Sequence, residues 1–335
     1  MEEIKTNRIR GYLDLDSYFR KHMDTFFYDL EDLHNKGLIE YEQSGISEKF
    51  WILSPHDGSR IVLYKDEELK SYGSYIELLV EEMAKIMEIP CAHYDLATFD
   101  GWKGVISYNF LKEDNNYSGF DVISMFYESK LAENPELCEL YNIDYEKDSI
   151  DDVSFKLNNL QDIWCILEDR YKEHPDKQMI VETIMNGLVD KLILDVVAVG
   201  VDSHVDNWII TSDNELSPAF DNSRALGITT KFKGLMDNNT MLQDDKLLLT
   251  VDNENIDKPL EVLEYFLKIS SSEYNDRVID KISKLEGNIN SIPTKIEERT
   301  EHCMPQLLKT YFISCMTEHL DKINEIISKN KVAKK

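Results

Sequence analysis

The sequence predicts an α+β fold of two lobes, with a small β-rich N-terminal lobe that contains one main helix and a larger, mostly helical C-terminal lobe. Short apolar runs separated by turn residues fill residues 45–115, one helical pattern interrupts them, and a mainly helical pattern follows. The 335 residues, 42% of them hydrophobic, are enough for each lobe to bury its own core. We expect the N-terminal lobe at 45–115, the C-terminal lobe at 116–331, and the join near 112–120.

Residues 1–44 are expected to form a separate helical extension. Their apolar side chains near helical spacing are Tyr18, Phe19, Phe26, Phe27, Leu30 and Leu33. The run from Leu30 to Leu53 faintly resembles a winged helix. However, the first 50 residues carry eleven acidic side chains against seven Lys and Arg, which disfavours DNA reading. A packing or partner-binding extension is favoured instead.

The N-terminal lobe is predicted to contain two strand pairs with a helix between them. β-prone runs at Phe50–Leu53 and Ile61–Tyr64 flank the turn residues Asp57-Gly58. A helix at about 74–88 follows and ends before Pro90. Its apolar face contains Leu78, Leu79, Met83, Ile86 and Met87. A second hairpin is expected, from Tyr94–Phe99 through the turn Asp100-Gly101 to Trp102–Leu111.

The C-terminal lobe has its clearest helical pattern at Val181–Val199. Gly200 follows where a helix commonly stops, and it is predicted to take the left-handed conformation there. Trp208–Ile210 predicts a short strand. Residues 228–258 are polar and predict a long mobile loop, whereas 259–331 returns to amphipathic helix.

Composition excludes several classes of function. The net charge of −27 disfavours nucleic-acid binding, because a phosphate ligand then needs a few local cations or a bound metal. No run of eighteen apolar residues exists, and the chain opens without a basic or apolar leader, which argues against membrane insertion and secretion. The five scattered cysteines form no CxxC pair and suggest reduced thiols in the cytoplasm.

Three polar residues form the pattern that points to chemistry. If Trp208–Thr211 and Leu216–Phe220 are the arms of a hairpin turning at Asp213-Asn214, Asn207 and Asp221 lie together at its open end, near Asp202. Mg²⁺ favours carboxylate and amide oxygens with phosphate oxygens, and phosphoryl transfer needs one carboxylate to orient the attacking hydroxyl. The alternative is an Asx-rich turn that only closes a hairpin.

The N-terminal half supplies a cation in the right order. Lys65 ends an apolar strand, where its side chain can reach nucleotide phosphates, and Glu77 begins the following helix, where it can pair with Lys65. A strand lysine held by a helical glutamate is a phosphate-binding arrangement of kinases. Glu81, one helical turn further on, is the rival partner.

On these residues the sequence resembles the HipA-like serine/threonine kinases, which have a protein-kinase-like fold related to phosphatidylinositol kinases. The match runs from Gly45 to Gly227 and includes the segments Tyr75-Ile76-Glu77, Glu88-Ile89-Pro90 and Gly104-Val105-Ile106-Ser107. The resemblance implies that Asp202 is the catalytic base, that Asn207 and Asp221 coordinate Mg²⁺, and that Lys65 is the phosphate-binding lysine. His204 follows the catalytic aspartate and is expected to brace the loop.

The sequence departs from this family in three places. Ser203 stands where the family often has Arg. No glycine-rich phosphate loop precedes Lys65, so Gly45, Ser47, Lys49 and the 54–59 turn are the residues available to cover the phosphates. The extension 1–44 has no placed counterpart.

The leading hypothesis is an ATP- and Mg²⁺-dependent protein kinase that acts on Ser or Thr, with itself among the substrates. Because some HipA-like kinases are toxins restrained by an antitoxin, a toxin–antitoxin role with an antitoxin or regulatory partner is a further expectation. A lipid or small-molecule kinase would use the same site, although the acidic charge disfavours approach to anionic membranes. An alternative of a different class is a nucleotide-binding pseudokinase or interaction module. The lack of a glycine-rich phosphate loop before Lys65 favours this alternative.

Overall fold

The structure, a computed structural model, describes residues 8–9, 12–14, 49–53, 61–66, 72–99, 102–111, 115–132, 134–144, 146–227, 246–252 and 256–333. The chain divides into two compact units. The first contains Met1–Asp114, Asp221–Asn239 and Lys281–Glu318, and the second contains Asn115–Phe220, Thr240–Asp280 and His319–Lys335. The expected lobe bounds, 45–115 and 116–331 with a join near 112–120, stay a prediction. The two later segments of the first unit belong to the stretch that the sequence assigns to the C-terminal lobe.

The first unit is built on a mixed sheet with the strand order β1-β2-β5-β6-β4-β3. The strands are β1 (Arg8–Ile9), β2 (Tyr12–Asp14), β3 (Lys49–Leu53), β4 (Ile61–Asp66), β5 (Tyr94–Phe99) and β6 (Trp102–Tyr108). Both predicted antiparallel pairs are present, β3 with β4 and β5 with β6. The strand β4 also pairs with β6, so it lies inside the sheet.

The helical prediction for residues 1–44 is wrong where the structure describes this segment. Arg8–Ile9 and Tyr12–Asp14 are strands, and β2 pairs in parallel with β5. The pairing residues on β5 are far away in sequence, so local periodicity carries no signal for it. The apolar positions that suggested a helix, and the residues between 15 and 48 that suggested a winged helix, lie outside the described residues.

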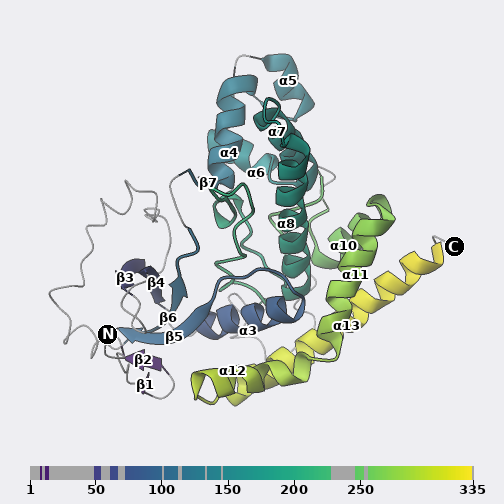
Figure 1. Cartoon of the computed structure of the whole chain (residues 1–335). Coiled ribbons are helices and arrows are strands. Elements are labelled where there is room, and N and C mark those ends of the chain that lie inside the picture. Colours follow the sequence, from purple (N-terminus) through teal and green to yellow (C-terminus); the bar gives the residue numbers. More distant parts are fainter. Residues whose placement is uncertain are drawn as a thin grey trace. The chain divides into compact units, whose positions relative to one another are not determined.

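The helix α3 (Gly73–Ile86) is the predicted main helix of the first unit, displaced by a residue or two at its ends. It packs against β5 and β6, and α12 (Ile292–Thr300) packs against it in turn (Figure 1). Every residue from Gly73 to Ala84 is buried. The helix therefore buries Glu77, Glu81 and Glu82 together with its apolar face, and each carboxylate needs partners to offset its desolvation.

The second unit is mainly helical around the long helix α8 (Lys177–Ala198). Helices α7 (Leu160–Arg170) and α10 (Pro259–Ile269) pack against α8, which is why α8 is buried almost all round in its second half. The other helices are α4 (Gly119–Phe126), the π-helical turn η2 (Tyr127–Leu131), α5 (Pro135–Leu140) and α6 (Ile150–Lys156). A two-stranded sheet joins β7 (Tyr117–Ser118) to β8 (Ile209–Ile210).

The helices α11 (Ser272–Glu286) and α13 (Gln306–Ala333) belong in part to each unit, and the single turn η4 (Ile289–Ser291) precedes α12. The helical prediction for 259–331 is therefore confirmed. Most of the loop predicted at 228–258 lies outside the described residues. Among the residues that the structure does describe, no helix is both long and apolar enough to cross a membrane.

The end of α8 corrects one prediction. The residue in the left-handed region is Val199, with φ 52°, rather than Gly200. Glycine is needed at position 200 for a different reason, because a Cβ there would lie 2.6 Å from Asp195 Oδ1. A β-branched residue at positive φ is strained, and the loop that holds Asp202 starts directly after it.

Gly119 is tightly enclosed by this loop, which leads to a stability prediction. A Cβ at Gly119 would lie 2.2 Å from Trp208 Cε2 and 2.5 Å from the Val205 carbonyl oxygen, and Trp208 is fully buried. We expect Gly119→Ala to lower the free energy of unfolding by about 1–3 kcal/mol, because this site is already full. Chemical denaturation measures the change. A Cβ at Gly287 meets no described atom within 4 Å, so Gly287→Ala is the matched control; equal losses would contradict the prediction.

Candidate active site

The first unit brings three of the predicted residues together. Lys65 lies on β4, and its Nζ forms an ion pair with Asp221 Oδ1 and lies 3.7 Å from Glu77 Oε1. The same ammonium group donates to Ser223 Oγ at 3.0 Å. The predicted pairing of Lys65 with Glu77 is therefore present. The Lys65 side chain is 15% exposed and the Asp221 side chain is 19% exposed, so both remain accessible to a ligand.

Glu77 is the buried member of this cluster. It is 1% exposed, and its Oε2 accepts the backbone N–H of Asn222 at 2.8 Å. Burial raises the pKa of Glu77 from 4.5 to about 7, against the opposing effect of the Lys65 ammonium. Its Oε1 accepts no hydrogen bond from the described residues, so Lys65 is the charge that compensates it.

Asp221 is held in an unusual backbone conformation beside this cluster. Its φ is 55°, in the left-handed region. The hydroxyl of Tyr94 on β5 accepts the Asp221 N–H at 3.0 Å, while Glu77 accepts the next N–H, that of Asn222. Burial raises the pKa of Tyr94 well above 10, so this side chain stays neutral. Two hydrogen bonds, accepted by one residue of the sheet and one of α3, thus hold the strained backbone of Asp221 and keep its carboxylate next to Lys65.

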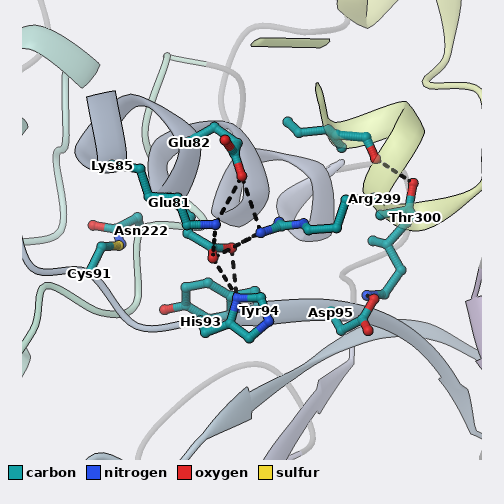
Figure 2. A network of polar contacts seen from close by, with 12 residues as sticks. Glu81, Glu82, Lys85, Cys91, His93, Tyr94, Asp95, Asn222, Arg299 and Thr300 are labelled. Carbon is teal, nitrogen blue, oxygen red and sulfur yellow. Dashed lines mark hydrogen bonds and ion pairs between the residues drawn. The ribbon is translucent and has the colours of Figure 1, made fainter. Parts of the chain in front are cut away.

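The rival partner Glu81 is excluded by its own contacts. Figure 2 shows its carboxylate surrounded by Arg299, Lys85 and His93. Burial by itself would raise the pKa of Glu81, but hydrogen bonds from His93 and Arg299 outweigh it and lower the pKa to about 2. Glu81 is therefore an ionised structural carboxylate, and Glu77 is the partner of Lys65.

Lys49 lies on β3 directly opposite Lys65 in the strand register. Its side chain is outside what the structure describes, so its predicted part in nucleotide binding stays a prediction. The same holds for Gly45, Ser47 and the 54–59 turn.

The second unit contains the other predicted residues, on the loop between α8 and β8. The single turn η3 (Val205–Asn207) ends at Asn207, which is 6% exposed. The amide nitrogen of Asn207 donates to the carbonyl oxygen of Asp202 at 2.6 Å. This hydrogen bond closes the loop on itself and ties Asn207 to Asp202, so the two predicted residues are held together locally.

His204 is the N-cap residue of the turn η3. Its Nδ1 accepts the backbone N–H of Asp206 at 3.3 Å, in the manner of a helix N-cap. Its backbone oxygen accepts the N–H of Asn207 at 2.9 Å. These contacts fit the bracing role expected for His204.

Ser203 is anchored in a buried polar network that the sequence does not reveal. Its hydroxyl donates to Asp195 Oδ2 at 2.5 Å and accepts from Lys191 Nζ at 3.0 Å, both on α8. Its carbonyl oxygen accepts from Asn158 Nδ2 at 2.9 Å, and Asn158 Oδ1 accepts from Trp208 Nε1 at 3.2 Å. The residue that departs from the family pattern is thus the one that fixes the loop from both sides.

The hairpin after this loop is confirmed, but its register differs from the expected one. Ile210 pairs with Leu216, and the Ser217 N–H donates to the Ile209 carbonyl at 2.8 Å. If Asn207 lay opposite Asp221, Ile210 would pair with Pro218, so the observed register is shifted by two residues. Because the turn spans Thr211 to Glu215, it is longer than a two-residue turn at 213–214.

Each unit, taken by itself, contains a predicted residue whose oxygen is of the chemical type that Mg²⁺ binds. Asp221 offers a partly exposed carboxylate in the first unit, and Asn207 offers an amide oxygen in the second, since its nitrogen is already donating. Both are hard oxygen donors of the kind that Mg²⁺ accepts beside phosphate oxygens. Lys65 adds a cation that can pair with a phosphate.

Tyr94, Asn222, Ser223 and Asp195 are site residues that the sequence analysis missed. Asn222 and Ser223 follow Asp221 directly, so proximity in sequence is a usable signal for them. Tyr94 begins a correctly predicted strand, but its hydroxyl contact spans 127 residues and leaves no local signal.

Comparisons with known proteins identify a similar fold among solved structures but no similar sequence. No family model matches the sequence, and no curated protein has a significantly similar sequence. Among solved structures, the toxin HipA of Shewanella oneidensis, solved with HipB and operator DNA, matches at 12% identity and a TM-score of 0.46, over 98% of this chain and 74% of that chain. The Helicobacter pylori proinflammatory kinase CtkA matches at 14% identity and a TM-score of 0.61, over 88% of this chain and 96% of that chain. The chain therefore has the α+β fold of this kinase.

Proposed function

We propose that this protein is an ATP- and Mg²⁺-dependent kinase that transfers the γ-phosphate of ATP to a Ser or Thr hydroxyl of a protein. The single observation that carries the proposal is the contact of Lys65 with both Glu77 and Asp221. A strand lysine held between a buried helical glutamate and an acidic metal ligand is the arrangement that positions phosphates in kinases. The fold supports the same reaction class.

The residues of the first unit bind and orient the nucleotide in this proposal. Lys65 leaves Asp221 to pair with the nucleotide phosphates, and Glu77 keeps the ammonium group in place. Asp221 is then available for Mg²⁺, which neutralises charge on the phosphate oxygens when bound. Tyr94 and Glu77 keep Asp221 in its strained conformation through the two backbone N–H groups.

The residues of the second unit act on the attacking hydroxyl. Asp202 is the carboxylate that orients the hydroxyl and accepts its proton. Asn207 supplies an amide oxygen for the cation, while its nitrogen holds the Asp202 carbonyl. His204 and Ser203 keep the loop in shape and take no part in the chemistry.

The protein's own Ser and Thr residues are included among the proposed substrates. An antitoxin or regulatory protein as a partner and a cytoplasmic location stay predictions from the sequence.

Phosphate transfer from labelled ATP tests the proposal. Wild-type protein with Mg²⁺ is expected to label itself or added protein, and EDTA is expected to abolish the labelling. Asp221→Ala should lower the rate about 100-fold, because it removes one of the groups that stabilise charge in the transition state. ATP-dependent thermal stabilisation without transfer would overturn the proposal in favour of a nucleotide-binding pseudokinase. Labelling of lipid or small molecules alone would place the chain among those kinases.

A further inference from the structure

A second charged cluster lies on α3, one helical turn beyond Glu77. Its centre is Glu81, which is 1% exposed. The carboxylate accepts both arms of the Arg299 guanidinium, with NH1–Oε1 and NH2–Oε2 distances of 2.9 Å each. Lys85 Nζ lies 2.8 Å and His93 Nδ1 lies 2.6 Å from Oε1 (Figure 2). Because the carboxylate is buried, these partners decide where this part of α3 can sit.

Arg299 is the partner from another helix, whereas Lys85 lies on α3 and His93 directly precedes β5. It lies on α12, and its guanidinium also reaches Glu82 Oε1 at 3.2 Å. A bidentate arginine fixes both distance and orientation of the carboxylate that it binds, whereas a lysine acts as a point charge. Arg299 therefore sets the position of α3 relative to α12 inside the first unit.

The charged cluster around Glu81 and the candidate site share one face of α3 and one neighbouring residue, Tyr94. Glu77 and Glu81 are four residues apart, so they project from the same side of the helix. The N–H of Tyr94 donates to Glu81 Oε2 at 3.2 Å, and the hydroxyl of the same Tyr94 accepts the Asp221 N–H at 3.0 Å. A shift of Glu81 would thus move Glu77 on one side and Tyr94 on the other.

The C-terminal end of α3 is held from the same part of the chain. Lys281 is buried, and its Nζ donates to the carbonyl oxygens of Glu88 at 2.9 Å and Met87 at 3.4 Å. A cation at this end of a helix also complements the helix dipole. The helix is therefore fixed at two points by residues that lie about 200 positions later in the sequence.

We propose that Arg299 is a positioning residue for nucleotide binding, which holds α3 so that Glu77 can present Lys65 to the phosphates. The inference rests on the proposed function, because Lys65 is taken as the phosphate-binding group. Loss of the bidentate contact leaves Glu81 buried with fewer partners, and α3 moves to relieve this charge. Nucleotide affinity then falls although no group that touches the nucleotide has changed.

Binding of a fluorescent ATP analogue with Mg²⁺ tests the proposal, at a temperature at which circular dichroism shows each variant to be folded. Arg299→Gln is expected to weaken binding about tenfold, which corresponds to the coupling that distant residues typically exert. The KM for ATP should rise by the same factor, with kcat at saturating ATP changed less than about threefold. Hydrogen exchange of the α3 amides should become faster.

Lys309→Met is the matched control, because it removes a helix-borne cation that pairs with Glu297 at 3.0 Å and is not among the described partners of Glu77, Glu81 or Glu82. It should leave affinity unchanged within about twofold. Arg299→Lys, which keeps the charge and loses the fork, decides the matter if Arg299→Gln does not fold. If a folded Arg299 variant keeps the wild-type nucleotide affinity and the wild-type hydrogen exchange of α3, this inference is overturned and the proposed function is not. A wild-type protein that binds no nucleotide would overturn the proposed function, and this inference with it.

Discussion

Asp202→Asn is expected to lower the rate of phosphate transfer about 10³-fold while nucleotide affinity stays close to that of the wild type. The amide has nearly the shape of the carboxylate but cannot accept the proton of the attacking hydroxyl, and general-base catalysis typically contributes 10²–10⁴-fold. The hydrogen bond from Asn207 should be kept, since it goes to the backbone carbonyl of residue 202. Initial rates with labelled ATP, with fluorescent nucleotide binding in parallel, measure both quantities.

Asp213→Asn provides the matched control for this substitution. Asp213 is exposed on the turn of the following hairpin, so the same chemical change is made a few residues away from the loop. We expect its transfer rate to equal that of the wild type. If Asp202→Asn keeps more than about a tenth of the wild-type rate, Asp202 is not the base, since the general-base contribution would then be too small.

Asp195→Ala should cause the largest loss of stability among the substitutions considered. Asp195 and Lys191 are 2% and 3% exposed. Lys191 Nζ lies 3.6 Å from Asp195 Oδ2, and both groups contact the Ser203 hydroxyl. Burial raises the pKa of Asp195, against Lys191 and Ser203. Removing the carboxylate leaves the Lys191 ammonium buried without its counter-charge, which typically costs about 3–5 kcal/mol. Chemical denaturation followed by circular dichroism measures the loss.

A double substitution separates the cost of the orphaned charge from the loss of packing. Lys191→Met together with Asp195→Ala should be more stable than Asp195→Ala alone, because no buried charge is left unpaired. The exposed pair Lys147–Asp144 is the surface control, and Asp144→Ala should change stability little. Additive losses in the double variant would show that Lys191 and Asp195 do not depend on one another.

The parts of the fold that could be predicted from the sequence are those with local causes. The helix α3 is set by its apolar spacing and by Pro90, and the β5–β6 hairpin by Asp100-Gly101 between two β-prone runs. The pairing of Lys65 with Glu77 was also predictable, since a strand end and the next helix start are constrained by few intervening residues.

The parts that could not be predicted depend on partners far away in sequence. The strand β2 exists because β5 lies beside it, and nothing in residues 12–14 indicates that neighbour. Glu81 could be rejected as the partner of Lys65 only because Arg299, 218 residues later, occupies it. Val199 takes a strained backbone because Gly200 must pass close to Asp195, which is a three-dimensional constraint.

The interrupted course of the first unit has a consequence for how the protein is made. Its sheet and α3 come from the first 114 residues, but Lys281 and Arg299 are synthesised only after residues 115–220 and 240–280 of the second unit. During translation, Glu81 is synthesised long before Arg299, so the N-terminal segment of the first unit stays incompletely folded until Arg299 is available. Completion of the first unit is therefore a late event that depends on long-range contacts, which are slow to form.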